Sequence, residues 1–282
     1  MNEYFSDHIA HFISSETGLE FLSTSGSSSA GLLWYELVPA DIHPNQSFVI
    51  RTEVHWRRIE VYFRLGRFAV DLLKSMNSAD EVKRALFVSI LSKCHDTDAK
   101  IELIVNENRF TFDDDCIWTQ SWSSFRFCVS KGMLSINEGN DQNDIRIVEE
   151  WTLLVVAAVI TLLPLSMESV EEEDPLGFPD GALSRVVRNR YERDRRNRVA
   201  ALAIHGNTCL GCGIDMAEKY GQFAAGVIEV HHIQPVSEIV SSKRINPRTD
   251  LVPLCPNCHS VVHLRNPPYT IDELQGLVLG EV

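Results

Sequence analysis

The chain has 282 residues, of which 44% are hydrophobic and 23% charged, which is the balance of an ordinary globular protein. This length exceeds what one hydrophobic core comfortably fills, so we expect two domains. Taken as a total, the net charge of −13 argues against a nucleic-acid partner, but this total hides a local basic segment described below.

No targeting or membrane segment is evident. Residues 1–20 lack the basic start and apolar run of a secretory signal. The longest apolar stretch, Trp151 to Leu165, is shorter than the roughly 20 residues that a membrane span needs, and Pro164 breaks its end. We therefore expect a cytoplasmic protein that makes no membrane contact.

Residues 1–165 predict an α+β domain. Residues 48–65 have the β-branched and aromatic content of two strands, with a turn near Arg57 and Arg58. Residues 78–94 predict a helix with Ser78 as its N-cap and Glu81 three residues on. Residues 23–31 predict a flexible Ser/Gly-rich loop, and residues 99–112 and 123–136 predict strands. Residues 144–165 predict a buried helix.

This first domain shows no catalytic constellation in its sequence. Its histidines have no partners at ligand spacing, so we expect them to be structural or merely exposed; they are His8, His11, His43, His55 and His95. Residues 1–170 carry a charge balance of −10, which argues against non-specific DNA binding. We therefore expect this first domain to have a role in specificity, partner binding or autoinhibition.

An acidic linker, broken by prolines and glycines, is predicted at residues 166–184. A helix follows from residue 185 and ends at Gly206, a typical C-cap. Its arginines outnumber its acids, which favours contact with phosphates over a merely solvated helix with i,i+4 ion pairs. The candidate DNA-binding residues are Arg185, Arg188, Arg190, Arg193, Arg195, Arg196 and Arg198.

Two Cys-x-x-Cys pairs form the strongest pattern in the chain. In a reducing compartment, Cys209 with Cys212 and Cys255 with Cys258 predict one structural zinc site with four thiolate ligands. Such a site is closed, so catalysis must lie elsewhere. The scattered cysteines are expected to be free thiols; they are Cys94, Cys116 and Cys128.

Four histidines beside these cysteines form a second constellation. His259 and His263 are spaced i,i+4, so on a helix both project from one face and can share an ion. The strand VIEVHHI carries His231 and His232, whose side chains point to opposite faces. One can bind a metal while the other acts as a general base, the pairing that phosphodiester hydrolysis needs. We therefore predict a ββα metal site.

In this order and spacing, several segments resemble the HNH, or ββα-metal, endonucleases and their zinc-containing McrA-like branch, associated with restriction and phage defence. The resemblance covers about residues 177–277 and rests on GFPDGA, RYERDRRNR, HGNTCLGCG, YGQFAAGVIEVHHIQPVSE, DLVPLCPNCHSVVH and NPPYTIDELQGL. The expected architecture is thus an α+β domain followed, at residues 185–282, by an HNH nuclease domain.

The resemblance implies a role for each site residue. His231, His259 and His263 would bind the catalytic divalent ion (Mg²⁺, Mn²⁺ or Ni²⁺), and His232 would be the general base. Asp250 stands where the family has an asparagine that braces the loop of the base. An ionised Asp accepts hydrogen bonds but cannot donate one, so this brace must differ.

The activity implied is cleavage or nicking of duplex DNA, with 5′ phosphate and 3′ hydroxyl products. Because an HNH site holds one catalytic centre, cutting both strands would require a homodimer or two successive nicks. The association with phage defence also implies protein partners from a defence system. The alternatives are an RNA-directed HNH nuclease and a non-catalytic zinc-ribbon module that binds DNA.

Overall fold

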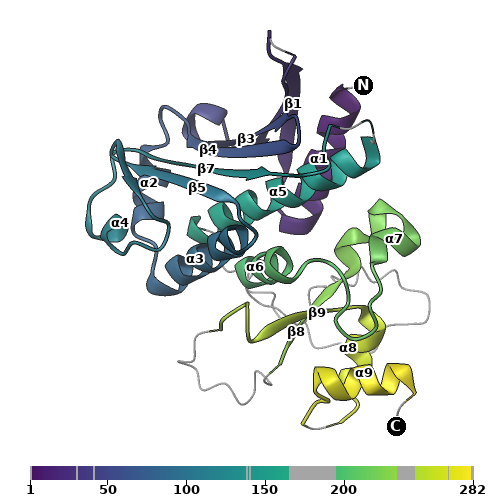
Figure 1. Cartoon of the computed structure of the whole chain (residues 1–282). Helices are drawn as coiled ribbons and strands as arrows, with labels where there is room; N and C mark the ends of the chain where they lie inside the picture. The colour runs from purple at the N-terminus through teal and green to yellow at the C-terminus, as the bar shows by residue number, and fades with distance from the viewer. Residues whose placement is uncertain are drawn as a thin grey trace, which may run out of the picture.

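The computed structural model describes residues 2–29, 31–40, 42–137, 139, 141–164, 195–233, 245–265 and 267–280. It has a large α+β unit at the N-terminal side and a smaller α+β unit at the C-terminal side, which confirms the expected fold class (Figure 1). The proposed linker at 166–184 and the first part of the arginine-rich helix lie outside the described residues.

The first unit contains a seven-stranded sheet in which every neighbouring pair is antiparallel, in the order β1-β2-β3-β4-β7-β5-β6. β3 and β4 form a hairpin that turns at Trp56 and Arg57, as the sequence predicted, and Arg57 takes the positive φ of 54° there. The strands are β1 Phe21–Ser27, β2 Leu33–Pro39, β3 Phe48–His55, β4 Arg58–Leu65, β5 Lys100–Val105, β6 Asn108–Phe110 and β7 Phe125–Gly132.

One face of this sheet is covered by helices. Alternate residues of β3, β4 and β7 are buried, as expected for a sheet with one packed and one open face. The long helix α5 (Asp141–Leu162) runs along the packed face between α1 (Asn2–Thr17) and α3 (Glu81–Asp96) (Figure 1). Its residues 151–162 are all buried, which confirms the predicted buried helix.

The remaining short elements of this unit connect the strands. They are the 3-10 helix η1 (Pro44–Gln46) and the helices α2 (Val70–Asn77) and α4 (Cys116–Thr119).

Two local predictions for this unit were wrong. Residues 23–27 of the predicted loop at 23–31 belong to strand β1, because they pair residue by residue with β2 and gain hydrogen bonds that their Ser/Gly composition does not indicate. The N-cap of α3 is Asp80, whose side chain accepts a hydrogen bond from the Lys83 amide at 3.0 Å. Ser78 instead ends α2.

Helix α6 (Arg195–His205) belongs to both hydrophobic cores. Val199, Ala200, Ala203 and Ile204 pack into the core of the first unit. Ala201 and Leu202 lie in the core of the second unit, so α6 lies between α3 and the strands of the second unit (Figure 1). The helix ends before Gly206, whose φ of 80° confirms the predicted C-cap.

The second unit is a two-stranded antiparallel sheet with short helices. Strands β8 (Glu229–His232) and β9 (Leu251–Leu254) pair, and α8 (Pro256–Val262) follows β9 directly, so the predicted ββα order is present. Helix α9 (Ile271–Leu279) begins with a capping box formed by Thr270 and Glu273. Two further elements connect α6 to β8, namely α7 (Met216–Tyr220) and the 3-10 helix η2 (Gln222–Val227).

In the part of the chain that the structure describes, no helix combines the length and the apolar character that spanning a bilayer demands.

A buried carboxyl group lies between α1 and α5. Glu149 is 3% exposed, and its Oε1 lies 2.9 Å from Nδ1 of His8. Burial and the nearby Glu16 raise the pKa of Glu149 to about 8, while burial and His11 lower the pKa of His8. Both shifts favour the uncharged forms, so near neutral pH this contact joins mostly uncharged groups.

This burial makes the stability of the first unit depend on pH. The folded state keeps the Glu149 proton up to about pH 8, whereas the unfolded chain loses it near pH 4.5, so unfolding becomes easier as pH rises through that window. Glu149→Gln should therefore raise the free energy of unfolding at pH 8 by roughly 1–3 kcal/mol and leave it nearly unchanged at pH 4.5. Denaturant melts of this variant and of the exposed neighbour Glu150→Gln at both pH values test this; equal effects of the two substitutions at pH 8 would contradict it.

Candidate functional site

The four cysteines of the two Cys-x-x-Cys pairs converge. Their sulfur atoms all lie within 4.8 Å of one another. Cys255 caps the N-terminus of α8, where its sulfur accepts from the Cys258 amide at 3.5 Å and Pro256 occupies the first turn. Cys209 and Cys212 lie on a knuckle that the Leu210 amide joins to the Pro253 carbonyl of β9 at 2.9 Å. The predicted ligands are thus brought together.

The chemistry of this cluster fits a zinc ion. Burial and the neighbouring thiols raise the pKa of Cys258, and burial also raises the pKa of Cys255. Four thiols packed together cannot all ionise without a cation between them, and Zn²⁺ accepts four thiolates in tetrahedral geometry. Gly211 keeps the knuckle close, since a Cβ there would lie 3.1 Å from the Cys258 sulfur and 2.8 Å from Leu274 Cδ2.

Three of the four predicted histidines form a second, separate cluster. His231 comes from β8, whereas His259 and His263 come from α8 and its C-cap. One ligand nitrogen from each lies within 4.8 Å of the others, and the ring centroids are 4.9–5.2 Å apart. His231 and His259 are buried and His263 is exposed, so the cluster opens to solvent on the His263 side.

The His231 imidazole is held in the form that binds metals. Burial, followed by the neighbouring His259, His263 and His232, lowers the pKa of His231 to about 3. Its Nδ1 is buried and has no hydrogen-bond partner among the described residues. A neutral imidazole with an unsatisfied nitrogen beside two others suits a divalent cation that also accepts water or phosphate oxygens.

Sequence reasoning missed Glu229. Its Oε2 lies 2.6 Å from Nδ1 of His259. With the carboxylate ionised, Nδ1 carries the proton and donates it, so Nε2 is the nitrogen left for a metal. Glu229 stands two residues before His231 on β8, on the same side of the strand. That spacing is the one signal by which the sequence could have indicated it.

His232 lies beside this cluster without joining it. It is 9% exposed and pairs with Leu251 in the β8–β9 ladder. Adjacent strand residues point to opposite faces, so the structure separates the two histidines as the sequence predicted. The role of His232 as a base remains a prediction.

Asp250 holds the turn that precedes β9. Its carboxylate accepts hydrogen bonds from the Asn246 amide at 2.8 Å and from the Thr249 hydroxyl at 2.9 Å. Its carbonyl accepts from the Ile233 amide at 2.9 Å, directly after His232. The Asp250 carboxylate therefore holds the turn by accepting hydrogen bonds, and its main-chain carbonyl ties this turn to the strand end next to His232.

The candidate DNA-binding arginines are only partly described. Arg185, Arg188, Arg190 and Arg193 lie outside the described residues, as does the side chain of Arg195. Arg196 and Arg198 are half-buried on α6. The Arg198 guanidinium donates to the Gly226 carbonyl at 3.3 Å, and burial lowers its pKa against the opposing influence of Glu16 and Glu229. Arg198 therefore lies against the protein, close to the carboxylate that orients His259.

Comparison with known families agrees with this geometry. Residues 209–265 match the family model described as HNH endonuclease, which identifies an HNH domain in the C-terminal unit. The matched segment contains both clusters and covers about a fifth of the chain. No curated protein and no solved structure matches. The match indicates a nuclease that binds metal ions and nucleic acid.

Removal of one thiol tests the zinc cluster. Cys258→Ser should release about one equivalent of zinc per chain and loosen the C-terminal unit, because a structural zinc site contributes folding energy directly. Elemental analysis and limited proteolysis measure both effects. Cys116→Ser, at an exposed thiol outside the cluster, is the control and should keep its zinc. Full zinc retention by Cys258→Ser would refute the assignment.

Loss of the Glu229 charge should weaken the histidine cluster without dismantling it. A glutamine at this position cannot stabilise the Nδ1 proton of His259 as a carboxylate does, so we expect Ni²⁺ to bind about 10–100-fold more weakly. Calorimetric titration of zinc-loaded Glu229→Gln, beside the exposed control Glu218→Gln, measures the change. Equal affinities in the two variants would show that Glu229 does not orient a ligand.

Proposed function

We propose that this chain is a metal-dependent HNH endonuclease that cuts or nicks duplex DNA, of the zinc-containing McrA-like kind. The observation that carries the proposal is the pair of separate clusters within one ββα unit, one of four thiols and one of three imidazoles. Four thiolates complete a tetrahedral site, so the imidazoles are left for an ion with open positions. A purely structural zinc module has no use for the second cluster.

The catalytic ion is assigned to His231, His259 and His263, and Mg²⁺, Mn²⁺ and Ni²⁺ are the candidates. When bound, it supplies positive charge that stabilises the phosphate in the transition state and the departing oxygen. The buried side chains of His231 and His259 fix two of its ligands, and Glu229 fixes the ring orientation of His259.

His232 is assigned the proton transfer. A neutral imidazole takes a proton from water, and the water attacks the phosphate in line with the bond that breaks. The P–O3′ bond breaks and the departing O3′ takes a proton from solvent, leaving a 5′ phosphate and a 3′ hydroxyl, and His232 returns its proton to solvent. Asp250 supports this role by fixing the backbone directly after His232.

Substrate binding is assigned to the arginine-rich segment, which sets seven arginines against two acids from Arg185 to Arg198 in an otherwise acidic chain. Arginine contacts to phosphate are sequence-independent. The first unit is assigned a role in specificity, partner binding or autoinhibition. The biological role we infer is restriction or phage defence in the cytoplasm, with a homodimer or two successive nicks where both strands are cut.

Cleavage of supercoiled plasmid by the zinc-loaded full chain tests the proposal. His232→Ala should lower the cleavage rate by about 10²–10⁴-fold because the general base is lost. His11→Ala, at an exposed histidine of α1, serves as control and should cleave at the wild-type rate. Parallel reactions with structured RNA separate a DNA enzyme from an RNA enzyme.

Two outcomes would contradict the proposal. Undiminished cleavage by folded His232→Ala would remove the base from its assigned role. Salt-sensitive DNA binding without cleavage in Mg²⁺, Mn²⁺ or Ni²⁺ would instead favour a zinc-ribbon binding module.

A further inference from the structure

A third group of potential metal ligands lies far from the nuclease site, on the open face of the seven-stranded sheet. Glu53 and His55 are two residues apart on β3, so their side chains share a face. Glu60 is the direct cross-strand partner of Glu53 on β4. The β3–β4 hairpin therefore places all three side chains together near its turn.

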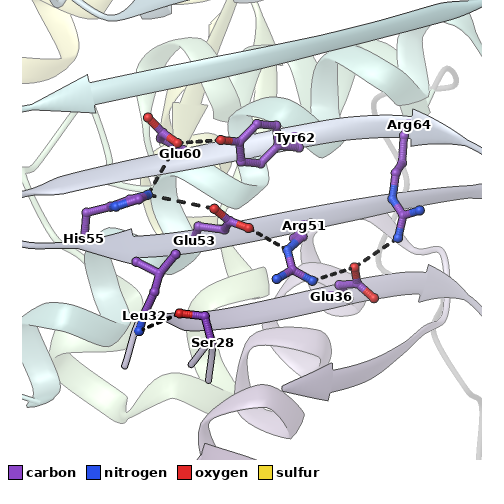
Figure 2. Close-up of polar contacts among 9 residues, drawn as sticks. All are labelled: Ser28, Leu32, Glu36, Arg51, Glu53, His55, Glu60, Tyr62 and Arg64. Carbon is purple, nitrogen blue, oxygen red and sulfur yellow. Dashed lines mark hydrogen bonds and ion pairs between the residues drawn. The ribbon is translucent and has the colours of Figure 1, made fainter. Parts of the chain in front are cut away.

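Their ligand atoms converge. Nε2 of His55 lies 3.3 Å from Oε2 of Glu60 and 3.9 Å from Oε2 of Glu53, and one ligand atom from each of the three residues lies within 4.8 Å of the others. Figure 2 shows the imidazole and both carboxylates pointing toward a common centre. The side chains are 17–24% exposed, so the group is shielded by the sheet and open to solvent on one side.

Neighbouring side chains bind the outer oxygens of both carboxylates. Arg51 Nε donates to Oε1 of Glu53 at 2.7 Å, and Arg58 Nε lies 3.5 Å from Oε1 of Glu60. Both arginines thus use the Oε1 atoms, while the Oε2 atoms face His55. Glu36 holds Arg51 in turn, at 3.0 Å (Figure 2).

Glu60 is oriented from a second side. The Tyr62 hydroxyl donates to its Oε2 at 2.5 Å, and burial and this hydrogen bond raise the pKa of Tyr62. Carboxylates that bind metal ions usually accept hydrogen bonds from neighbouring groups, because these contacts fix the direction of the ligand oxygen. The arrangement is therefore preorganised.

Two features favour a cation at the centre. Carboxylates directly opposite each other on paired strands repel, and Arg51 and Arg58 offset this charge only at the outer Oε1 atoms. Nε2 of His55 is shielded from solvent, yet it has no hydrogen-bond partner in the described parts of the chain, since its contact with Glu60 lacks hydrogen-bond geometry. A metal ion would satisfy that nitrogen and neutralise both Oε2 atoms.

We propose that Glu53, His55 and Glu60 form a binding site for a divalent first-row transition ion. One imidazole nitrogen and two carboxylate oxygens suit Mn²⁺, Fe²⁺ or Zn²⁺, and the imidazole disfavours Mg²⁺ and Ca²⁺. The exposed side of the site leaves positions for water. An ion here would cross-link β3 and β4 beside the turn, independently of the nuclease centre. This finding corrects the expectation that His55 has no partners at ligand spacing.

Manganese binding by the zinc-loaded full chain tests the site. Electron paramagnetic resonance counts bound Mn²⁺ at a fixed free concentration, and the count should fall by one per chain in His55→Ala and in the double variant Glu53→Gln/Glu60→Gln. Glu102→Gln removes one negative charge from the same open face, where Glu102 forms an ion pair with Arg109, and should bind as many ions as the wild type.

The count separates this proposal from the nuclease assignment, because the expected difference is one ion whether or not the His231 cluster also binds manganese. Mn²⁺ should also raise the melting temperature of the wild type more than that of the double variant. Equal counts and equal thermal shifts in the wild type and both site variants would overturn the proposal and leave His55 as an ion-pair partner of the two glutamates.

Discussion

The candidate nuclease site depends on the cluster of four thiols. Cys255 caps α8 and Cys258 lies in its first turn, so the cluster fixes the start of the helix whose next residue is His259. The first knuckle is joined to β9, the partner strand of the one that carries His231. A zinc ion held by the four thiols would therefore set the distance between the strand and the helix that share the imidazole cluster. In the proposal, the thiol cluster supplies rigidity and the imidazole cluster holds an ion with open coordination positions.

Helix α6 packs against both the first unit and the second unit and so joins them. Its apolar residues enter both hydrophobic cores. At its end, Nε2 of His205 lies 2.9 Å from the Pro247 carbonyl, in the turn that Asp250 braces. Arg248 in that turn pairs with Asp96, at the end of α3, at 2.9 Å. The turn next to His232 is thus held from the first unit, which gives that unit a physical route by which to influence the site.

The sequence predicted most of the site because its ligands lie in short local patterns. The spacing of the cysteines predicts a shared metal site, and the i,i+4 spacing of the histidines places both on one face of a helix. In the first unit, the length of the apolar run predicts the buried helix α5. Contacts between segments that are distant in the sequence could not be predicted from local patterns. Glu229 gains its meaning only when α8 places His259 against it, and Glu60 only from the register of β3 with β4. Strand β1 was missed for the same reason, since pairing with β2 outweighs its Ser/Gly composition.

Anomalous diffraction from crystals of the full chain grown with zinc and manganese would test the central claim most directly. The account predicts zinc at about 2.3 Å from the four sulfurs, and a separate ion at about 2.0–2.2 Å from one nitrogen each of His231, His259 and His263. That second ion should keep water on the exposed His263 side. The account would be contradicted by crystals with a filled thiol site in which the three imidazoles bind no ion, or by an ion there whose coordination is closed by protein ligands alone.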